Sequence, residues 1–86
     1  MTSPLTIERA AEVSGYPVAV LRGPARDRSI CMVRWAVMAT LRARGLSLPT
    51  IGRLLNRDHT TVISGLNRAA YLDRDHSFKI LMEAIS

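Results

Sequence analysis

Residues 47–62 of this chain, SLPTIGRLLNRDHTTV, decide its fold. Ser47 is placed to cap a short helix from Leu48 to about Leu55, because its hydroxyl can accept a hydrogen bond from a backbone N–H group of the first turn. Pro49 suits the second position of that helix, since first-turn N–H groups have no partner inside the helix. Asn56 is a residue type that ends helices in the left-handed conformation. The first half of the stretch therefore predicts a short helix that stops at Asn56.

The second half of the stretch predicts another helix, which begins after a tight turn. Asp58 is a good N-cap, because its carboxylate can accept from the unpaired N–H groups of the first turn. Apolar residues at steps of three and four then extend the helix to about Leu72, namely Val62, Leu66 and Ala69. Two helices separated only by the interval Asn56 to Asp58 predict a helix-turn-helix over about residues 48–72.

This second helix offers short polar side chains where it begins. His59, Thr60 and Thr61 project from its first turn, and Ser64 and Arg68 continue the outward face. A helix start with hydrogen-bonding side chains and free N–H groups suits the major groove of DNA. Taken alone, each of these residues would be an ordinary surface residue. Their position after a helix-turn-helix turn, in basic surroundings, favours the DNA-reading interpretation.

Further helices are predicted on either side of the helix-turn-helix. Hydrophobic periodicity indicates helices at Thr2 to Ser14, at Ile30 to about Ala43, and around Phe78 to Ile85, with one or two turns at Val18 to Leu21. In the middle of a helix, Gly65 costs roughly 1 kcal/mol relative to Ala. A close contact with another helix, which leaves no room for a side chain, would explain glycine at this position. We expect an all-α fold of about five helices, forming one domain over residues 1–86.

The charge is concentrated in the middle of the chain. The net charge is +5, and 11 of the 12 cations are arginine, which favours forked contacts with phosphate or guanine. Between Arg22 and Arg68, nine arginines stand against two acidic residues, a local net charge of +7, while the remaining ends together carry −2. The middle of the chain is therefore the predicted anion-binding surface.

A basic loop is predicted at Gly23 to Arg28, with Arg26 and Arg28 at its tip and Ser29 as the cap of the next helix. This loop could enter a groove of DNA, or it could be an ordinary solvated loop in which Asp27 pairs with a neighbouring arginine. Arg57, beside the start of the second helix, could reach a phosphate.

The composition narrows the other possibilities. Cys31 is a single cysteine without an internal partner, the N-terminus has no signal-peptide pattern, and no apolar run approaches the roughly 20 residues that span a bilayer. We therefore expect a cytoplasmic protein that has no membrane partner. Cys31 and His76 lack metal-ligand spacing with His59, so we expect no metal site and no cofactor.

An enzyme and a protein-binding adaptor are the two other functional classes on which the sequence bears. An enzyme would use Asp58, His59 and a threonine as a hydrolytic set, but consecutive residues in a helical turn fan about 100° apart and cannot converge on one reacting atom. A protein-binding adaptor without DNA binding remains an alternative, although it would not need so many arginines along one surface.

The sequence resembles the C-terminal DNA-binding domain, domain IV, of the bacterial replication initiator DnaA, over nearly the whole chain. Residues 47–62, with Arg-Asp-His-Thr-Thr-Val intact at 57–62, carry the resemblance, together with Gly23, Arg26 and Arg28 and with Arg34 eight residues after Arg26. Two departures are Leu55-Asn56, where the family usually has Phe-Gly, and a link after Ala43 that is one residue short. The resemblance implies an all-α fold of the Trp-repressor-like type.

The resemblance also implies roles for individual residues. In the family, the recognition helix reads an asymmetric DnaA box of the TTATCCACA type in the major groove, and a basic-loop arginine enters the adjacent minor groove. The implied base contacts are Asp58, His59, Thr60, Thr61 and, in the minor groove, Arg26. The implied phosphate contacts are Arg34, Arg42, Arg68, Leu48 and Pro49, to which the residues themselves add Arg28, Arg57 and Ser64.

One part of the initiator's function, nucleotide binding, is not expected of this chain. The reason is that no Gly-rich Walker loop occurs in its sequence. We expect double-stranded DNA as the partner, a monomeric, nucleoid-associated state, and a role in replication initiation or its regulation. Replication-initiation proteins are further candidate partners. A transcription regulator with another DNA site, or an adaptor, is the alternative.

Overall fold

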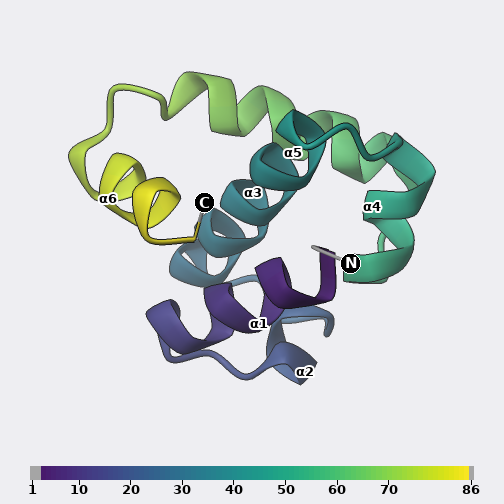
Figure 1. Cartoon of the computed structure of the whole chain (residues 1–86), viewed down its shortest axis with the longest axis horizontal. Helices are drawn as coiled ribbons and strands as arrows, with labels where there is room; N and C mark the ends of the chain where they lie inside the picture. Colours follow the sequence, from purple (N-terminus) through teal and green to yellow (C-terminus); the bar gives the residue numbers. More distant parts are fainter. Residues whose placement is uncertain (1–2, 86) are drawn as a thin grey trace.

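The computed structural model describes residues 3–85, and all regular structure in this range is helical (Figure 1). The elements in order are α1 (Ser3–Ser14), α2 (Val18–Leu21), α3 (Arg28–Ala43), α4 (Leu48–Leu55), α5 (His59–Tyr71) and α6 (His76–Ile85). The all-α prediction is confirmed. These six helices exceed the expected five because the short apolar segment forms a full turn, α2. Thr2, predicted to lie in the first helix, falls outside the described residues.

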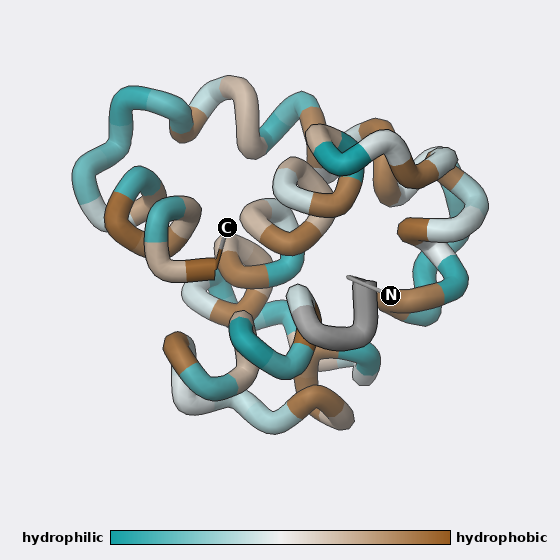
Figure 2. Tube along the Cα trace, viewed as in Figure 1, coloured by the Kyte–Doolittle hydropathy of each residue, from teal (hydrophilic) through white to brown (hydrophobic). Residues whose placement is uncertain are grey.

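Helix α3 is the centre of the fold. It packs against each of the other five helices, and Figure 1 shows it running through the middle of the molecule, with α5 crossing one of its ends. Its buried residues recur at helical spacing and include Val33, Val37 and Leu41. In Figure 2, the turn between α5 and α6 is mainly hydrophilic, whereas α3 and α4 include hydrophobic segments. One apolar stripe on α3 thus organises the core.

The helix-turn-helix forms as the sequence predicts. The Oγ atom of Ser47 accepts from the N–H of Thr50 at 3.3 Å and caps α4. Asn56 ends α4 with φ 57° and ψ 46°, the left-handed conformation. The N–H of Arg57 then donates to the carbonyl of Gly52 at 2.7 Å, which closes the turn. A Cβ atom on Gly52 would overlap the carbonyl oxygen of Arg57, so this close approach requires glycine.

The prediction for Gly65 is also confirmed. A Cβ atom there would overlap the Sδ of Met38 and lie 3.0 Å from the Cδ1 of Trp35, both on α3. Glycine therefore allows α5 to cross α3 closely, which sets how far the outward face of α5 stands from the rest of the molecule.

The predicted start of α3 is wrong by two residues. The helix begins at Arg28 with Asp27 as the N-cap residue, and the N–H of Cys31 donates to the carbonyl of Asp27 at 2.9 Å. Ser29 is not the cap, because it lies inside the helix and its hydroxyl is hydrogen-bonded to that of Tyr16. Periodicity located the first buried residue, Ile30, but the exposed turn before it carries no apolar signal. Arg28 consequently stands on the first turn of α3 and not at a loop tip.

Within residues 3–85, no helix is long and apolar enough to cross a membrane.

Candidate nucleic-acid interface

The first turn of α5 is ordered by Asp58. Its Oδ1 atom accepts from the N–H of Thr61 at 2.9 Å and from the hydroxyl of Thr60 at 2.8 Å. The hydrogen bond from the Thr61 N–H, followed by those from the threonine hydroxyls, lowers the pKa of Asp58 to about 2. The carboxylate is therefore charged at neutral pH. The capping role that its position predicts is confirmed, and its exposed oxygens still have lone pairs that a base could use.

The outward face of α5 is polar and open to solvent. His59, Thr60, Thr61 and Ser64 are all exposed, as the sequence predicted for a helix face. Asn67 continues this face one turn further on and is also exposed, although it was not among the predicted contacts. Helical spacing could have identified it, because Asn67 lies seven residues after Thr60 and so on the same side of the helix.

A groove of about 700 Å³ runs beside α5 and separates it from the basic loop. Arg26, Trp35 and Thr61 are among the residues that line it. The structure thus brings the predicted minor-groove arginine and a residue of the recognition turn to one hollow, although they are 35 residues apart in the chain.

Trp35 lies at the edge of the core and also lines the groove. It is half-buried against the core, and the guanidinium of Arg68 stands 6.0 Å from its ring centroid. This is the distance of a cation–π contact, which orients Arg68 while leaving it exposed.

Arg34 lies in a different place from the one that the resemblance implied. It is only 4% exposed, so its guanidinium is not on the surface. It donates to the carbonyls of Leu21 at 2.8 Å, Ala25 at 2.6 Å, Gly23 at 2.9 Å and Val20 at 3.1 Å. Burial, followed by the nearby charge of Arg57, lowers the pKa of Arg34 below its usual value. Its donors hold the chain that leads into the basic loop, which corrects its assignment to a phosphate.

Arg57 also turns inward. Its side chain is half-buried and donates to the carbonyls of Leu55 and Asn56, each at 3.1 Å, and to that of Gly23. Its predicted phosphate contact would compete with these bonds. The sequence carried no signal for this arrangement, because a carbonyl 34 residues away leaves no local pattern.

Three other predicted phosphate contacts, Arg42, Leu48 and Pro49, do not line the groove beside α5. Arg42 is exposed and donates to the carbonyl of Leu46 at 2.9 Å, which directs it toward the loop before α4. At the start of α4, Pro49 is exposed and Leu48 is half-buried. Arg42 and Pro49 are therefore accessible for contact with a phosphate backbone.

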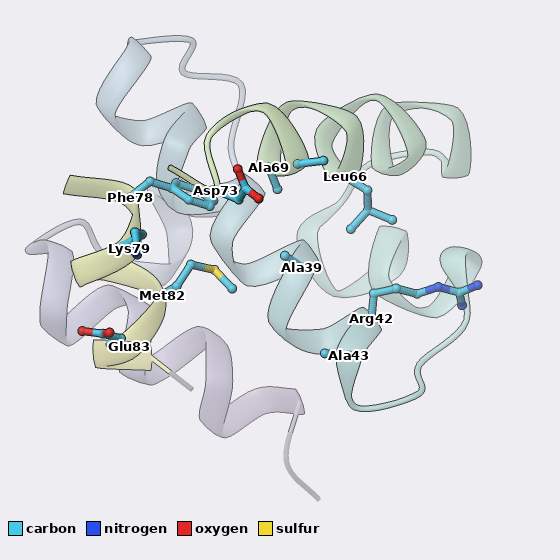
Figure 3. A pocket seen from close by; sticks show the side chains of 11 residues that line it. Ala39, Arg42, Ala43, Leu66, Ala69, Asp73, Phe78, Lys79, Met82 and Glu83 are labelled. Atoms are coloured by element: carbon cyan, nitrogen blue, oxygen red, sulfur yellow. The ribbon is translucent and has the colours of Figure 1, made fainter. Parts of the chain in front are cut away.

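Arg42 also borders a hollow of about 570 Å³ between α3, α5 and α6. Figure 3 shows Leu66, Phe78 and Met82 around this hollow, while the Arg42 side chain extends away from α6. Its lining combines apolar side chains of the three packed helices with four charged residues, Arg42, Asp73, Lys79 and Glu83.

No group of histidine, cysteine or acidic side chains in the part of the chain that the structure describes is arranged to hold a metal ion. Cys31 is half-buried and lines the groove beside α5.

Comparison with known proteins identifies the family of the helix-turn-helix. The family model of the bacterial DnaA protein helix-turn-helix matches residues 6–69, which include α4 and nearly all of α5. The chromosomal replication initiator protein DnaA of Thermomicrobium roseum is 40% identical over 70 residues, covering 79% of this chain. The chain spans about 15% of the length of that relative. The chain therefore belongs to the bacterial DnaA helix-turn-helix family, as a DNA-binding domain of the kind used in replication initiation.

Proposed function

We propose that residues 1–86 act as one domain that binds double-stranded DNA at sites of the DnaA-box type, with α5 in the major groove and Arg26 in the adjacent minor groove. The observation that carries this proposal is the exposed first turn of α5, which Asp58 orders and which shares a groove with Arg26 of the basic loop. A major groove about 12 Å wide admits one helix and places the two sugar-phosphate strands along its flanks.

In this proposal, the first turn reads the bases. Thr60 and Thr61 have both a hydroxyl and a methyl group and can contact a thymine methyl. His59 can exchange hydrogen bonds with a base edge, and Asp58 can accept from a cytosine amino group. Because Asp58 caps the first turn of α5 in the free protein, little conformational entropy of this turn is lost on binding DNA.

The exposed groups outside that turn hold the phosphates. On the loop side these are Arg28, Ser64 and Arg68, and on the other side Arg42 and the start of α4 at Leu48 and Pro49. Phosphate contacts of this kind position a protein on the duplex without reading sequence. Arg34 and Arg57 are omitted from this set because their donors are bonded to carbonyl groups.

We further propose that the domain acts as a monomer in the cytoplasm, associated with the nucleoid, and regulates initiation by occupying initiator boxes. The site of the family is asymmetric, which suits one domain per box. Replication-initiation proteins would then meet it on DNA, either as competitors or as partners.

The test is fluorescence anisotropy of the chain on a duplex containing a TTATCCACA-type box and on a scrambled duplex of equal length, at near-physiological salt. We expect tighter binding to the box by at least about tenfold, the effect of roughly 1.4 kcal/mol in base contacts. Equal binding to both duplexes would refute box recognition and favour a regulator with another site. Failure to bind either duplex would favour the adaptor alternative.

A further inference from the structure

The chain enters the basic loop from a helix end. Helix α2 is a single turn that ends at Leu21, and the last carbonyls of a helix have no partner within it and carry partial negative charge. Arg34 from α3 donates to Val20 and Leu21 in this end and to Gly23 and Ala25 beyond it. Arg26 follows directly on Ala25, so the backbone of the loop is fixed up to the residue before Arg26.

A second arginine reaches the same loop from the helix-turn-helix. Arg57 donates to the carbonyl of Gly23, which also accepts from Arg34, so two guanidinium groups share one acceptor. Through its other terminal nitrogen, Arg57 donates to Leu55 and Asn56 in the turn before α5. The Nδ2 of Asn56 adds a bond to the carbonyl of Arg22 at 3.4 Å. Arg57 therefore joins the turn before α5 to the root of the basic loop.

This pairing of like charges is not the arrangement that stability alone would favour. Two cations at one carbonyl repel each other, and the proximity of Arg57 contributes to the lowered pKa of Arg34. The forked guanidinium instead gives Arg57 several donors in fixed directions, which can hold two chain segments in one geometry.

We infer that Arg57 is a positioning residue that sets where Arg26 stands relative to the first turn of α5, so that the loop and the recognition helix read DNA as one rigid unit. Arg57 directly precedes the cap Asp58, and Gly23 lies three residues before Arg26, so a single side chain spans from one reading element to the other. The inference rests on the proposed function for the roles of Arg26 and α5. It adds that an arginine of the recognition motif acts on the loop through the protein and without touching DNA.

A double-mutant cycle with Arg26→Ala and Arg57→Met tests the coupling on the box and scrambled duplexes. Arg26→Ala should lower the preference for the box by about tenfold in the natural chain, a loss of roughly 1.4 kcal/mol. With Arg57→Met already present, the same change should cost less than about threefold, because the loop is no longer held in register. Equal losses in both backgrounds would overturn the inference.

Salt dependence separates positioning from direct phosphate contact. If Arg57 contacted a phosphate, Arg57→Met would reduce the slope of log K against log salt by about one counterion. We expect that slope to change by much less than this. Arg57→Lys keeps the charge without the fork, and should leave the coupling to Arg26 as weak as in Arg57→Met. A coupling fully restored by lysine would show that charge alone suffices, against the inference.

Arg53→Met is the matched control. Arg53 is exposed on α4 and donates a hydrogen bond to the hydroxyl of Thr50 at 3.2 Å, so its replacement removes the same charge and side chain from a site away from the loop. Helix content by circular dichroism shows that each variant folds. In the Arg53→Met background, Arg26→Ala should still lower the preference for the box by about tenfold. A smaller effect of Arg26→Ala in this background as well would show that the loss of any nearby positive charge weakens the coupling, against the inference.

The positioning is also tested without DNA. Nuclear magnetic relaxation of the backbone amides of residues 25–27 should show larger amplitudes of motion in Arg57→Met than in the natural chain or in Arg53→Met, with α5 unchanged. This measurement stands even if the natural chain does not prefer the box, which would refute the proposed function alone. A loop equally ordered in all three proteins would overturn the inference and leave the proposed function untouched.

Discussion

Asp58 orders the first turn of the recognition helix in the absence of DNA. Its hydrogen bonds with Thr61 and Thr60 explain both the sharp start of α5 and the lowered pKa of its carboxyl group. The sequence predicted the cap because capping depends on residues only three apart. The partners of Arg34 could not be predicted, because they lie 9 to 14 residues away and depend on how α2 packs against α3.

The lowered pKa of Asp58 predicts a pH dependence of stability. Its pKa falls from 3.8 to about 2 on folding, so the unfolded chain takes up the proton first as the pH falls. The stabilisation is complete above the unfolded value near pH 4 and disappears as the pH falls toward 2. Asp58→Asn keeps a capping side chain but does not titrate. Its free energy of unfolding, measured by urea denaturation, should therefore fall less between pH 4 and pH 2 than that of the natural chain, and parallel curves would contradict this.

Thr61 belongs to the same turn but is predicted to act on DNA. Thr61→Ala removes a hydroxyl and a methyl group from an exposed position, so the fold should be almost unaffected. We expect it to lower the preference for the box by roughly 1 to 3 kcal/mol while binding to scrambled DNA stays nearly constant. Competition binding with both duplexes measures this difference. An equal loss on both sequences would place Thr61 among the phosphate contacts.

At the scale of elements, the helix-turn-helix was the most predictable part of the fold. The cap at Ser47, the left-handed stop at Asn56 and the cap at Asp58 are local signals, and all three are confirmed. The start of α3 was missed because its first turn is exposed and polar, which periodicity does not register. The groove between the basic loop and α5 could likewise not be predicted from the sequence, because it depends on how α3 and α5 cross.

Two glycines in these elements should respond differently to alanine. At Gly52 the added Cβ would meet the backbone carbonyl of Arg57, whereas at Gly65 it would meet the flexible end of Met38 and the ring of Trp35. We expect Gly52→Ala to lower the free energy of unfolding by roughly 1 to 3 kcal/mol despite the better helix propensity of alanine. Gly65→Ala should cost less, because the Met38 side chain can move. Chemical denaturation of both variants measures which one loses more free energy of unfolding. A larger loss in Gly65→Ala than in Gly52→Ala would mean that the turn at Gly52 can widen.

For the whole molecule, total charge is a poor guide to the DNA contact. Nine arginines lie between Arg22 and Arg68, but Arg34 and Arg57 direct their donors to carbonyl groups of the loop root and the turn. Those two still raise the positive potential near the groove. They differ from the exposed arginines because a group bonded inside the protein does not displace counterions from a phosphate.

This division of the arginines predicts the salt dependence of binding. Three exposed arginines contact phosphates in the proposed complex, Arg28, Arg42 and Arg68, and Arg26 lies in the minor groove. Three neutralised phosphates give a slope of log K against log salt of roughly −3, and any counterion displaced by Arg26 would bring it to roughly −4, since each contributes about −0.9. If every arginine of the central region bound phosphate, the slope would approach roughly −8. Anisotropy titrations on the scrambled duplex at several salt concentrations measure it, and Arg42→Gln should make the slope shallower by about one. A slope near −8 would mean that Arg34 and Arg57 leave their carbonyl partners on binding, and that the loop is not held in place by the protein alone.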